Sequence, residues 1–265
     1  MSANPRRTDG PLSPWWRQAA ILVMVAGFSI LSFMTVQSYK NAPPIPETVK
    51  DVSGAPVMTG ADILKGQEVF LKYALMEHGT LWGHGAYLGP DYSAEYLHRL
   101  SEISRDTIAK ERFGKLFGQL ASSDQGAVSA DVKRTLKENR YDASAKALVM
   151  SPGEVASYQI QQGEWAGYFT KKGGAPGLPE NYIKDPAELK ALTAYFSWAA
   201  WAASTNRPGR DYTYTNNFPY EPLAGNKPST QAYVWSAMSL VCLLAGLGLI
   251  LFVFGRFDYL GWGGA

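Results

Sequence analysis

A loop about one third of the way along the chain combines residue types that can hold a hard cation. Residues 81–92 read LWGHGAYLGPDY, with three glycines, a proline and two tyrosines among twelve positions. Gly83 and Gly85 let the backbone turn its carbonyl groups in directions that residues with a side chain rarely allow. Tyr87 adds a phenolic oxygen two residues later. Carbonyl and phenol oxygens suit calcium if a partner chain supplies carboxylates. A tight loop around a packed tyrosine is the alternative.

Other kinds of reactive site find little support in the sequence. His84 and His98 could bind zinc or copper together with Asp91 or Glu95, but their spacing of fourteen residues matches no known motif for these metals. We expect the imidazoles to form hydrogen bonds at a subunit interface instead. Cys242 is the one cysteine, which excludes an intrachain disulfide and a Cys-x-x-Cys site. No Gly-x-Ser-x-Gly, Walker or His-Glu-x-x-His motif indicates a hydrolase. A net charge of +2 gives no basis for a nucleic-acid partner.

Two long apolar runs predict membrane-spanning helices. Residues 19–36 and 233–255 contain no charged residue, and about 20 apolar residues cross a hydrocarbon core of ~30 Å. Trp15, Trp16 and Trp235 are typical of the membrane interface. The first run could be a signal peptide, but its apolar core exceeds the usual ~7–15 residues and no Ala-x-Ala-like cleavage site follows, which favours an uncleaved anchor. Neither run contains a histidine or an acidic residue, so neither can ligate heme or metal or relay protons.

Positive charges at the two ends predict the orientation. Arg6, Arg7 and Arg17 outnumber Asp9 before the first run, and Arg256 follows the second, so both ends are expected in the cytoplasm. The predicted division is a cytoplasmic tail at 1–18, a span at 19–36, an extracytoplasmic (periplasmic) domain at 37–232, a span at 233–255 and a cytoplasmic tail at 256–265.

Helix start motifs predict a mainly helical outer domain. N-terminal caps are expected at Thr59, at Asp91 or Ser93, at Ser151 and at Asp185. A helix over 189–205 is apolar on most sides, so we expect it to form the buried core. Residues 41–57 are proline-rich and extended, residues 210–230 form an aperiodic loop at the membrane surface, and no alternating strand pattern is found. The predicted fold class is an all-α membrane protein with two transmembrane helices flanking a helical domain.

Three motifs in the outer domain resemble a known family. They are GHGAYLGPDYSAEYLHR (Gly83–Arg99), ASTNRP (Ala203–Pro208) and TYTNNFPYEPL (Thr213–Leu223). Together with the order of span, outer domain and span, they resemble the amino-terminal part of quinol-dependent nitric oxide reductases, which belong to the heme–copper oxidase superfamily. In that family two NO molecules, two electrons from quinol and two protons give N₂O and water.

The resemblance implies a cytochrome c-like outer domain without heme. Leu75, His78 and Gly79 occupy the positions of the cysteines and the histidine in the Cys-x-x-Cys-His motif of the related cytochrome subunits, so heme cannot be attached covalently. The resemblance also implies a calcium ion at the junction with the catalytic part, bridging heme propionates and partner glutamates. Its ligands in this chain would be the Gly85 carbonyl and the Tyr87 hydroxyl.

The resemblance further implies that catalysis belongs to a partner chain. The sequence ends shortly after the second run, without the family's histidines for heme b, heme b3 and non-heme iron, so the chain is either a separate small subunit or a fragment. We expect it to pack on that multi-helix heme subunit in a bacterial inner membrane, to cover the propionates, and to border the route of quinol or protons. Interface contacts are expected from His84, Asp91, Tyr92, His98, Arg99, Asn216 and Asn217.

Two alternatives remain at this stage. The same architecture could serve a relative that dismutates nitric oxide to N₂ and O₂, since nothing in this chain separates the two reactions. A membrane-anchored binding or sensor domain has the same layout but needs a cytoplasmic output domain, and about ten residues follow the second run. An electron-carrying cytochrome c is excluded by the absent cysteines.

Overall fold

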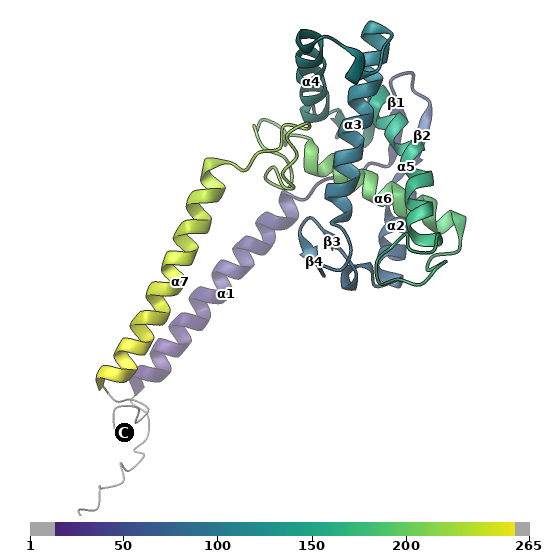
Figure 1. The fold of residues 1–265 in the computed structure, drawn as a ribbon. Coiled ribbons are helices and arrows are strands. Elements are labelled where there is room, and N and C mark those ends of the chain that lie inside the picture. Colours follow the sequence, from purple (N-terminus) through teal and green to yellow (C-terminus); the bar gives the residue numbers. More distant parts are fainter. Residues whose placement is uncertain (1–13, 258–265) are drawn as a thin grey trace, which may run out of the picture. The chain divides into compact units, whose positions relative to one another are not determined.

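The computed structural model describes residues 14–257 (Figure 1), and the chain divides into two units. The first unit, Met1–Pro43, contains α1 (Pro14–Lys40), and the second, Pro44–Ala265, contains the other elements. The helices of the second unit are α2 (Gly60–Lys72), α3 (Tyr92–Phe113), α4 (Ser122–Lys137), α5 (Pro152–Thr170), α6 (Pro186–Ser204) and α7 (Thr230–Phe257), with 3₁₀ turns η1 (Leu75–Glu77) and η2 (Phe117–Gln119). Its strands are β1 (Thr48–Asp51), β2 (Pro56–Thr59), β3 (Thr80–Leu81), β4 (His84–Gly85), β5 (Tyr141–Asp142) and β6 (Ala147–Met150).

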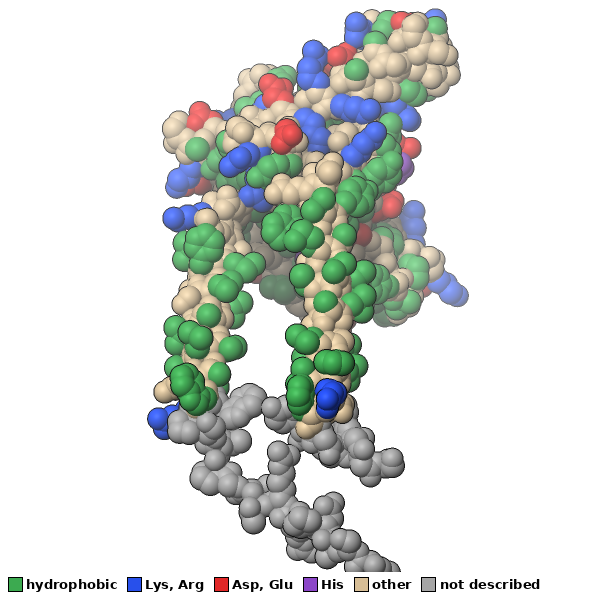
Figure 2. All heavy atoms as spheres, turned by 90° about the vertical axis from the view of Figure 1, so that its left-hand side faces the viewer, with side chains coloured by type: hydrophobic (Ala, Val, Ile, Leu, Met, Phe, Trp, Pro, Cys, Tyr) green, Lys and Arg blue, Asp and Glu red, His purple; other side chains and the backbone are tan. Residues whose placement is uncertain are grey.

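The helices α1 and α7 are long and apolar enough to cross a membrane. They have 27 and 28 residues, so each is longer than the apolar run predicted within it. Their side chains are mostly hydrophobic and exposed, as Figure 2 shows. A membrane protein with two spanning helices around a mainly helical domain is therefore confirmed. Arg6, Arg7 and Asp9 lie outside the described residues, so the orientation drawn from them stays a prediction.

Local capping determines where the helices of the outer domain begin. The Thr59 hydroxyl accepts a hydrogen bond from the Asp62 amide at 3.2 Å, while the Asp62 carboxylate accepts one from the Thr59 amide at 2.8 Å. Ser151 and Glu154 form the same reciprocal pair at the start of α5, and Asp185 caps α6. Each cap satisfies amide groups that have no partner within the helix. The predicted starts at these positions are confirmed.

The helix α6 forms the centre of the outer domain and packs against α2, α3 and α5. Almost all of its side chains are buried, as the apolar pattern over 189–205 predicted. The crossing with α2 is close because Gly66 has no side chain: a Cβ there would lie 2.1 Å from the carbonyl oxygen of Ala191. Glycine at this contact allows two helix backbones to approach more closely than larger residues permit.

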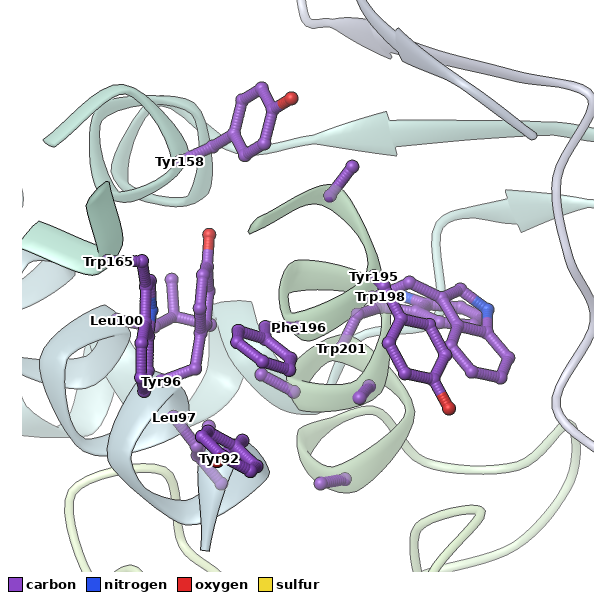
Figure 3. Close-up of a cluster of buried hydrophobic side chains, with 14 of the residues drawn as sticks. Tyr92, Tyr96, Leu97, Leu100, Tyr158, Trp165, Tyr195, Phe196, Trp198 and Trp201 are labelled. Atoms are coloured by element: carbon purple, nitrogen blue, oxygen red, sulfur yellow. The ribbon is translucent and has the colours of Figure 1, made fainter. Parts of the chain in front are cut away.

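Aromatic side chains fill the space between α3, α5 and α6 (Figure 3). The ring of Phe196 stacks on Tyr92 with centroids 4.9 Å apart and meets Trp165 edge-on at the same separation. Trp165 in turn lies 6.2 Å from Phe169. Such pairs contribute roughly 0.5–1.5 kcal/mol each beyond the area they bury. The cluster therefore fixes the three helices against one another.

Two small sheets differ from the purely helical pattern expected between the helices. In the larger sheet β1 pairs with β2 antiparallel and with β6 parallel, and β5 completes the order β2-β1-β6-β5. The strands have two to four residues, too few for alternation to be detected in the sequence. The parallel pairing also joins segments about a hundred residues apart, which no local pattern predicts. The smaller sheet, β3–β4, forms the base of the glycine-rich loop.

Candidate functional site

The glycine-rich loop between β3 and α3 is held in place by one carboxylate. Asp91 Oδ2 accepts hydrogen bonds from the Thr80 hydroxyl at 2.8 Å and the Gly83 amide at 2.6 Å. Its Oδ1 accepts from the Ser93 hydroxyl at 2.5 Å and from the Ala94 amide at 2.9 Å, which caps α3. Four donors thus use both carboxylate oxygens. Asp91 was expected at a subunit interface, but its side chain has an internal role as a clamp between the loop and the helix.

The backbone of the loop requires glycine at two positions. Gly83 has φ +80° and Gly85 has φ +139°, both in the region that side chains disfavour. A Cβ on Gly85 would lie 2.2 Å from the Gly79 carbonyl oxygen, and one on Gly83 would lie 3.0 Å from the ring of Phe218. The second contact brings the loop beside the segment that precedes α7.

The tip of the loop projects its side chains into solvent. Tyr87 is 90% exposed and Leu88 is 60% exposed, although the Ala86 amide between β4 and Tyr87 donates to the Met76 carbonyl at 2.7 Å. His84 and Gly85 are exposed as well. A large aromatic side chain held on an ordered backbone and left in solvent is typical of a surface that another molecule covers.

The donor atoms at the tip meet only part of the demand of a calcium ion. Calcium takes six to eight oxygen ligands, and the loop offers the Gly85 and Tyr87 oxygens that the sequence indicated. Asp91 cannot add to them while its oxygens accept four hydrogen bonds. Within residues 14–257 no group of three or more His, Cys, Asp or Glu side chains gathers around a possible metal position. A calcium ion at the tip would therefore need most of its ligands from another chain, and the calcium site stays a prediction.

The positions equivalent to a heme attachment motif do not fit heme. Leu75 is fully buried and His78 is 4% exposed. His78 Nε2 donates to the carbonyl oxygen of Pro176 at 2.6 Å, and its Nδ1 lies 2.8 Å from the Tyr92 hydroxyl. A Cβ on Gly79 would lie 2.9 Å from the Tyr92 ring. Side chains of this domain therefore fill the region, and His78 is a buried link between η1, α3 and the loop after α5.

Tyr92 lies in the core of the outer domain and not at its surface, where an interface residue was expected. Its side chain is fully buried, stacked on Phe196, and burial raises the pKa of its hydroxyl. Tyr92 precedes Tyr96 by four residues, so both lie on the inner face of α3. The interface expectation at this position is therefore wrong, since a side chain inside the core has no surface to offer a partner.

Arg99 and His98 on α3 both contact carboxylates of the same chain. Arg99 contacts Glu164 at 2.5 Å and Glu102 at 2.9 Å. His98 Nδ1 lies 2.8 Å from Glu221, which ties α3 to the segment that precedes α7. Both side chains keep part of their surface in solvent. Their contact with a partner remains a prediction.

A cavity of about 550 Å³ opens beside the loop, between α3 and α5. Its wall includes Leu88, Pro90, Glu95, Trp165 and Tyr168. Burial and the nearby Glu95 carboxylate raise the pKa of the Tyr168 hydroxyl to about 12. Among the described residues that line it there is no histidine, serine, threonine or cysteine, so the lining offers no nucleophile paired with a histidine base.

The segment before α7 contains two residues that the sequence indicated and two that it did not. Asn217 uses its side chain within the segment, accepting from the Thr213 amide at 3.1 Å and donating to the Lys227 carbonyl at 3.1 Å. Asn216 is exposed and has φ +55°. Phe218 and Tyr220, which belong to the stretch expected on the partner but were not named individually, are 43% and 65% exposed on either side of a proline. The Phe-Pro-Tyr sequence could have indicated these two residues, because exposed aromatic residues are enriched at interfaces.

Comparison with known proteins supplies one match. Residues 46–220 match the family model of the NorB cytochrome c-like domain, a domain of nitric oxide reductase. The matched range begins before β1 and ends within the segment before α7, so it covers most of the outer domain, including the loop and the cavity. No curated protein matches the chain.

Proposed function

The chain belongs to the family of NorB cytochrome c-like domains of nitric oxide reductase, and we propose that it acts as the non-catalytic outer part of a quinol-dependent nitric oxide reductase. In this proposal it packs on a catalytic heme chain in a bacterial inner membrane, with the outer domain in the periplasm. The observation that carries the proposal is the ordered loop tip, where Tyr87 is 90% exposed above the Asp91 clamp.

Catalysis is assigned to the partner chain. Reduction of two NO molecules to N₂O and water with two electrons and two protons would take place at heme b, heme b3 and non-heme iron held by that chain. The apolar runs 19–36 and 233–255 carry no histidine or acidic residue that could ligate these groups. The proposed role of α1 and α7 is to pack against lipid and the helices of the partner.

We further propose that the loop tip contributes to a calcium site between the chains. The Gly85 carbonyl and Tyr87 hydroxyl would hold the ion together with partner carboxylates. When bound, the ion would offset negative charge clustered at the interface. What this chain does is position the two oxygens: the β3–β4 pairing and the Asp91 clamp fix the backbone that carries them.

A Tyr87→Phe variant tests the loop tip, with Tyr220→Phe as the matched control. Both tyrosines are exposed, at 90% and 65%, and both substitutions remove one hydroxyl from the surface. The complex would be purified through this chain, and its calcium content and NO turnover measured together with the amount of partner recovered. We expect Tyr87→Phe to lower calcium content and turnover while assembly remains. Tyr220→Phe, which keeps its aromatic ring at the surface, should leave the calcium content unchanged. Normal calcium and turnover in Tyr87→Phe would contradict the ligand role.

A further inference from the structure

Three lysines belong to the turn that precedes α7 or to the helix that contacts it. Lys133 and Lys137 lie in the last turns of α4, and both side chains lie against Gly225: a Cβ on that glycine would lie 3.4 Å from Lys137 Cε and 3.5 Å from Lys133 Cγ. The Lys137 ammonium donates to the Asn226 side chain. Lys227 follows immediately in the sequence. We call Lys133, Lys137 and Lys227 the basic turn.

None of these lysines forms an ion pair with a carboxylate of the described chain. Arg134, on the same helix, pairs with Asp131 at 2.9 Å, whereas none of the three lysines of the basic turn forms an ion pair with an Asp or Glu within residues 14–257. Burial without such a partner lowers the pKa of Lys137 to about 8. Gathering like charges and burying one of them costs free energy, and an anion held between them would recover it.

The sequence places the basic turn at the membrane surface. Lys227 precedes Thr230, the first residue of α7, by three residues, which even fully extended span at most about 11 Å. The exposed aromatic residues Tyr233 and Trp235 follow, as is typical where a helix passes through the headgroup layer. Because Lys133 and Lys137 contact Gly225 and Asn226 of the same turn, all three lysines remain close to the lipid headgroups whatever else the outer domain contacts.

We propose that the basic turn binds the phosphate of an anionic phospholipid at the surface of the membrane facing the outer domain. Lysine ammonium groups near a membrane surface attract anionic lipids additively, each contributing roughly a fivefold change in affinity. The three together predict about a 100-fold preference for an anionic over a zwitterionic headgroup, weakening with salt. The site would anchor the turn between α4 and α7. This proposal does not depend on the nitric oxide reductase assignment.

The test compares lipid binding to the purified full chain in a non-ionic detergent. Phosphatidylglycerol and phosphatidylcholine would be titrated separately, and the bound lipid counted by native mass spectrometry. The variant Lys133→Gln/Lys137→Gln/Lys227→Gln removes the basic turn. The control substitutes glutamine at Lys115, Lys172 and Lys190, which are exposed and form no ion pair with any residue that the structure describes. The control therefore has the same net charge as the variant.

We expect phosphatidylglycerol to bind the native chain and the control equally, and the triple variant to lose about 100-fold. Lys137 also donates to Asn226, so the triple variant could disturb the fold. The double variant Lys133→Gln/Lys227→Gln changes two exposed positions only, and it should lower the affinity for phosphatidylglycerol by about 25-fold with the fold intact. Equal binding of the two lipids by the native chain, or equal losses in variant and control, would overturn the proposal. Inorganic phosphate and chloride would also be compared as competitors at equal ionic strength. If phosphate displaces the lipid more strongly than chloride does, the site binds free phosphate and the proposal is overturned.

Discussion

The Asp91 clamp makes a quantitative prediction, because a second helix cap in the same domain supplies its control. Asp91 and Asp185 both cap long helices through an aspartate side chain. The only side-chain hydrogen bond of Asp185 within the described chain goes to the Ala187 amide, at 2.9 Å. Asp91 caps α3 in the same way and also binds Thr80 and Gly83. Replacing each aspartate by alanine therefore separates the helix cap from the loop clamp.

The expected loss in free energy of unfolding for each variant follows from the number of hydrogen-bond donors that it leaves without an acceptor. Loss of an N-cap costs about 1 kcal/mol, so Asp185→Ala should lower the free energy of unfolding by about that amount. Asp91→Ala should cost the same plus the two hydrogen bonds to the loop. Hydrogen bonds to a charged acceptor contribute roughly 1.5–3 kcal/mol each, and partial exposure of Asp91 favours the lower end. The expected loss for Asp91→Ala is about 4 kcal/mol.

Two assays on the full chain in detergent would measure this difference. Thermal unfolding followed by near-ultraviolet circular dichroism reports the packed aromatic core, in which Tyr92 and Trp165 lie. Hydrogen exchange reports the Gly83 amide directly: its protection should be lost in Asp91→Ala and kept in Asp185→Ala. Equal losses of stability in the two variants, or a Gly83 amide that stays protected without the carboxylate, would refute the clamp.

Further predictions concern the core and the buried lysine. Gly66→Ala should lower the free energy of unfolding by about 3 kcal/mol, because the new Cβ would lie 2.1 Å from the Ala191 carbonyl oxygen. Gly163→Ala, which has open space around it, should raise the free energy of unfolding by up to about 1 kcal/mol. Thermal unfolding measures both, and a similar loss in the two variants would contradict the close crossing of α2 and α6. The pKa of Lys137 is lowered from 10.5 to about 8 by burial, so between these values the unfolded chain binds the additional proton. Relative to Lys137→Met, the native chain should therefore gain free energy of unfolding as the pH rises across this window, by about 2 kcal/mol after a discount for partial exposure. The same pH dependence in the two proteins would contradict the role of Lys137.

Local rules explain most of what could be predicted of the fold. Thr59, Ser151 and Asp185 are caps whose partners lie two or three residues away, so the sequence alone determines them. The two apolar runs and the buried helix α6 follow from composition in the same way. The sheet β2-β1-β6-β5 could not be predicted, because its pairing depends on how distant segments meet rather than on any pattern within two to four residues.

The backbone of the glycine-rich loop was predicted better than the roles of its side chains. Glycine-rich composition correctly indicated an unusual backbone around Gly85 and an available tyrosine at position 87. The roles of Asp91 and Tyr92 were misjudged, although the helical spacing from Tyr92 to Tyr96 already placed it on the inner face of α3. The link from His78 to Pro176 joins residues nearly a hundred positions apart, so it could be recognised only from the folded chain.

The central claim is that this chain is the non-catalytic outer part of a nitric oxide reductase. Its most direct test is purification from native membranes through a tag on this chain, followed by heme, iron and calcium analysis and by measurement of NO turnover. We predict a co-purifying large chain with b-type hemes, non-heme iron and calcium, and N₂O as the product. Formation of N₂ and O₂ would show that the same architecture serves a nitric oxide dismutase. A stable preparation without heme, iron or a partner chain would contradict the claim.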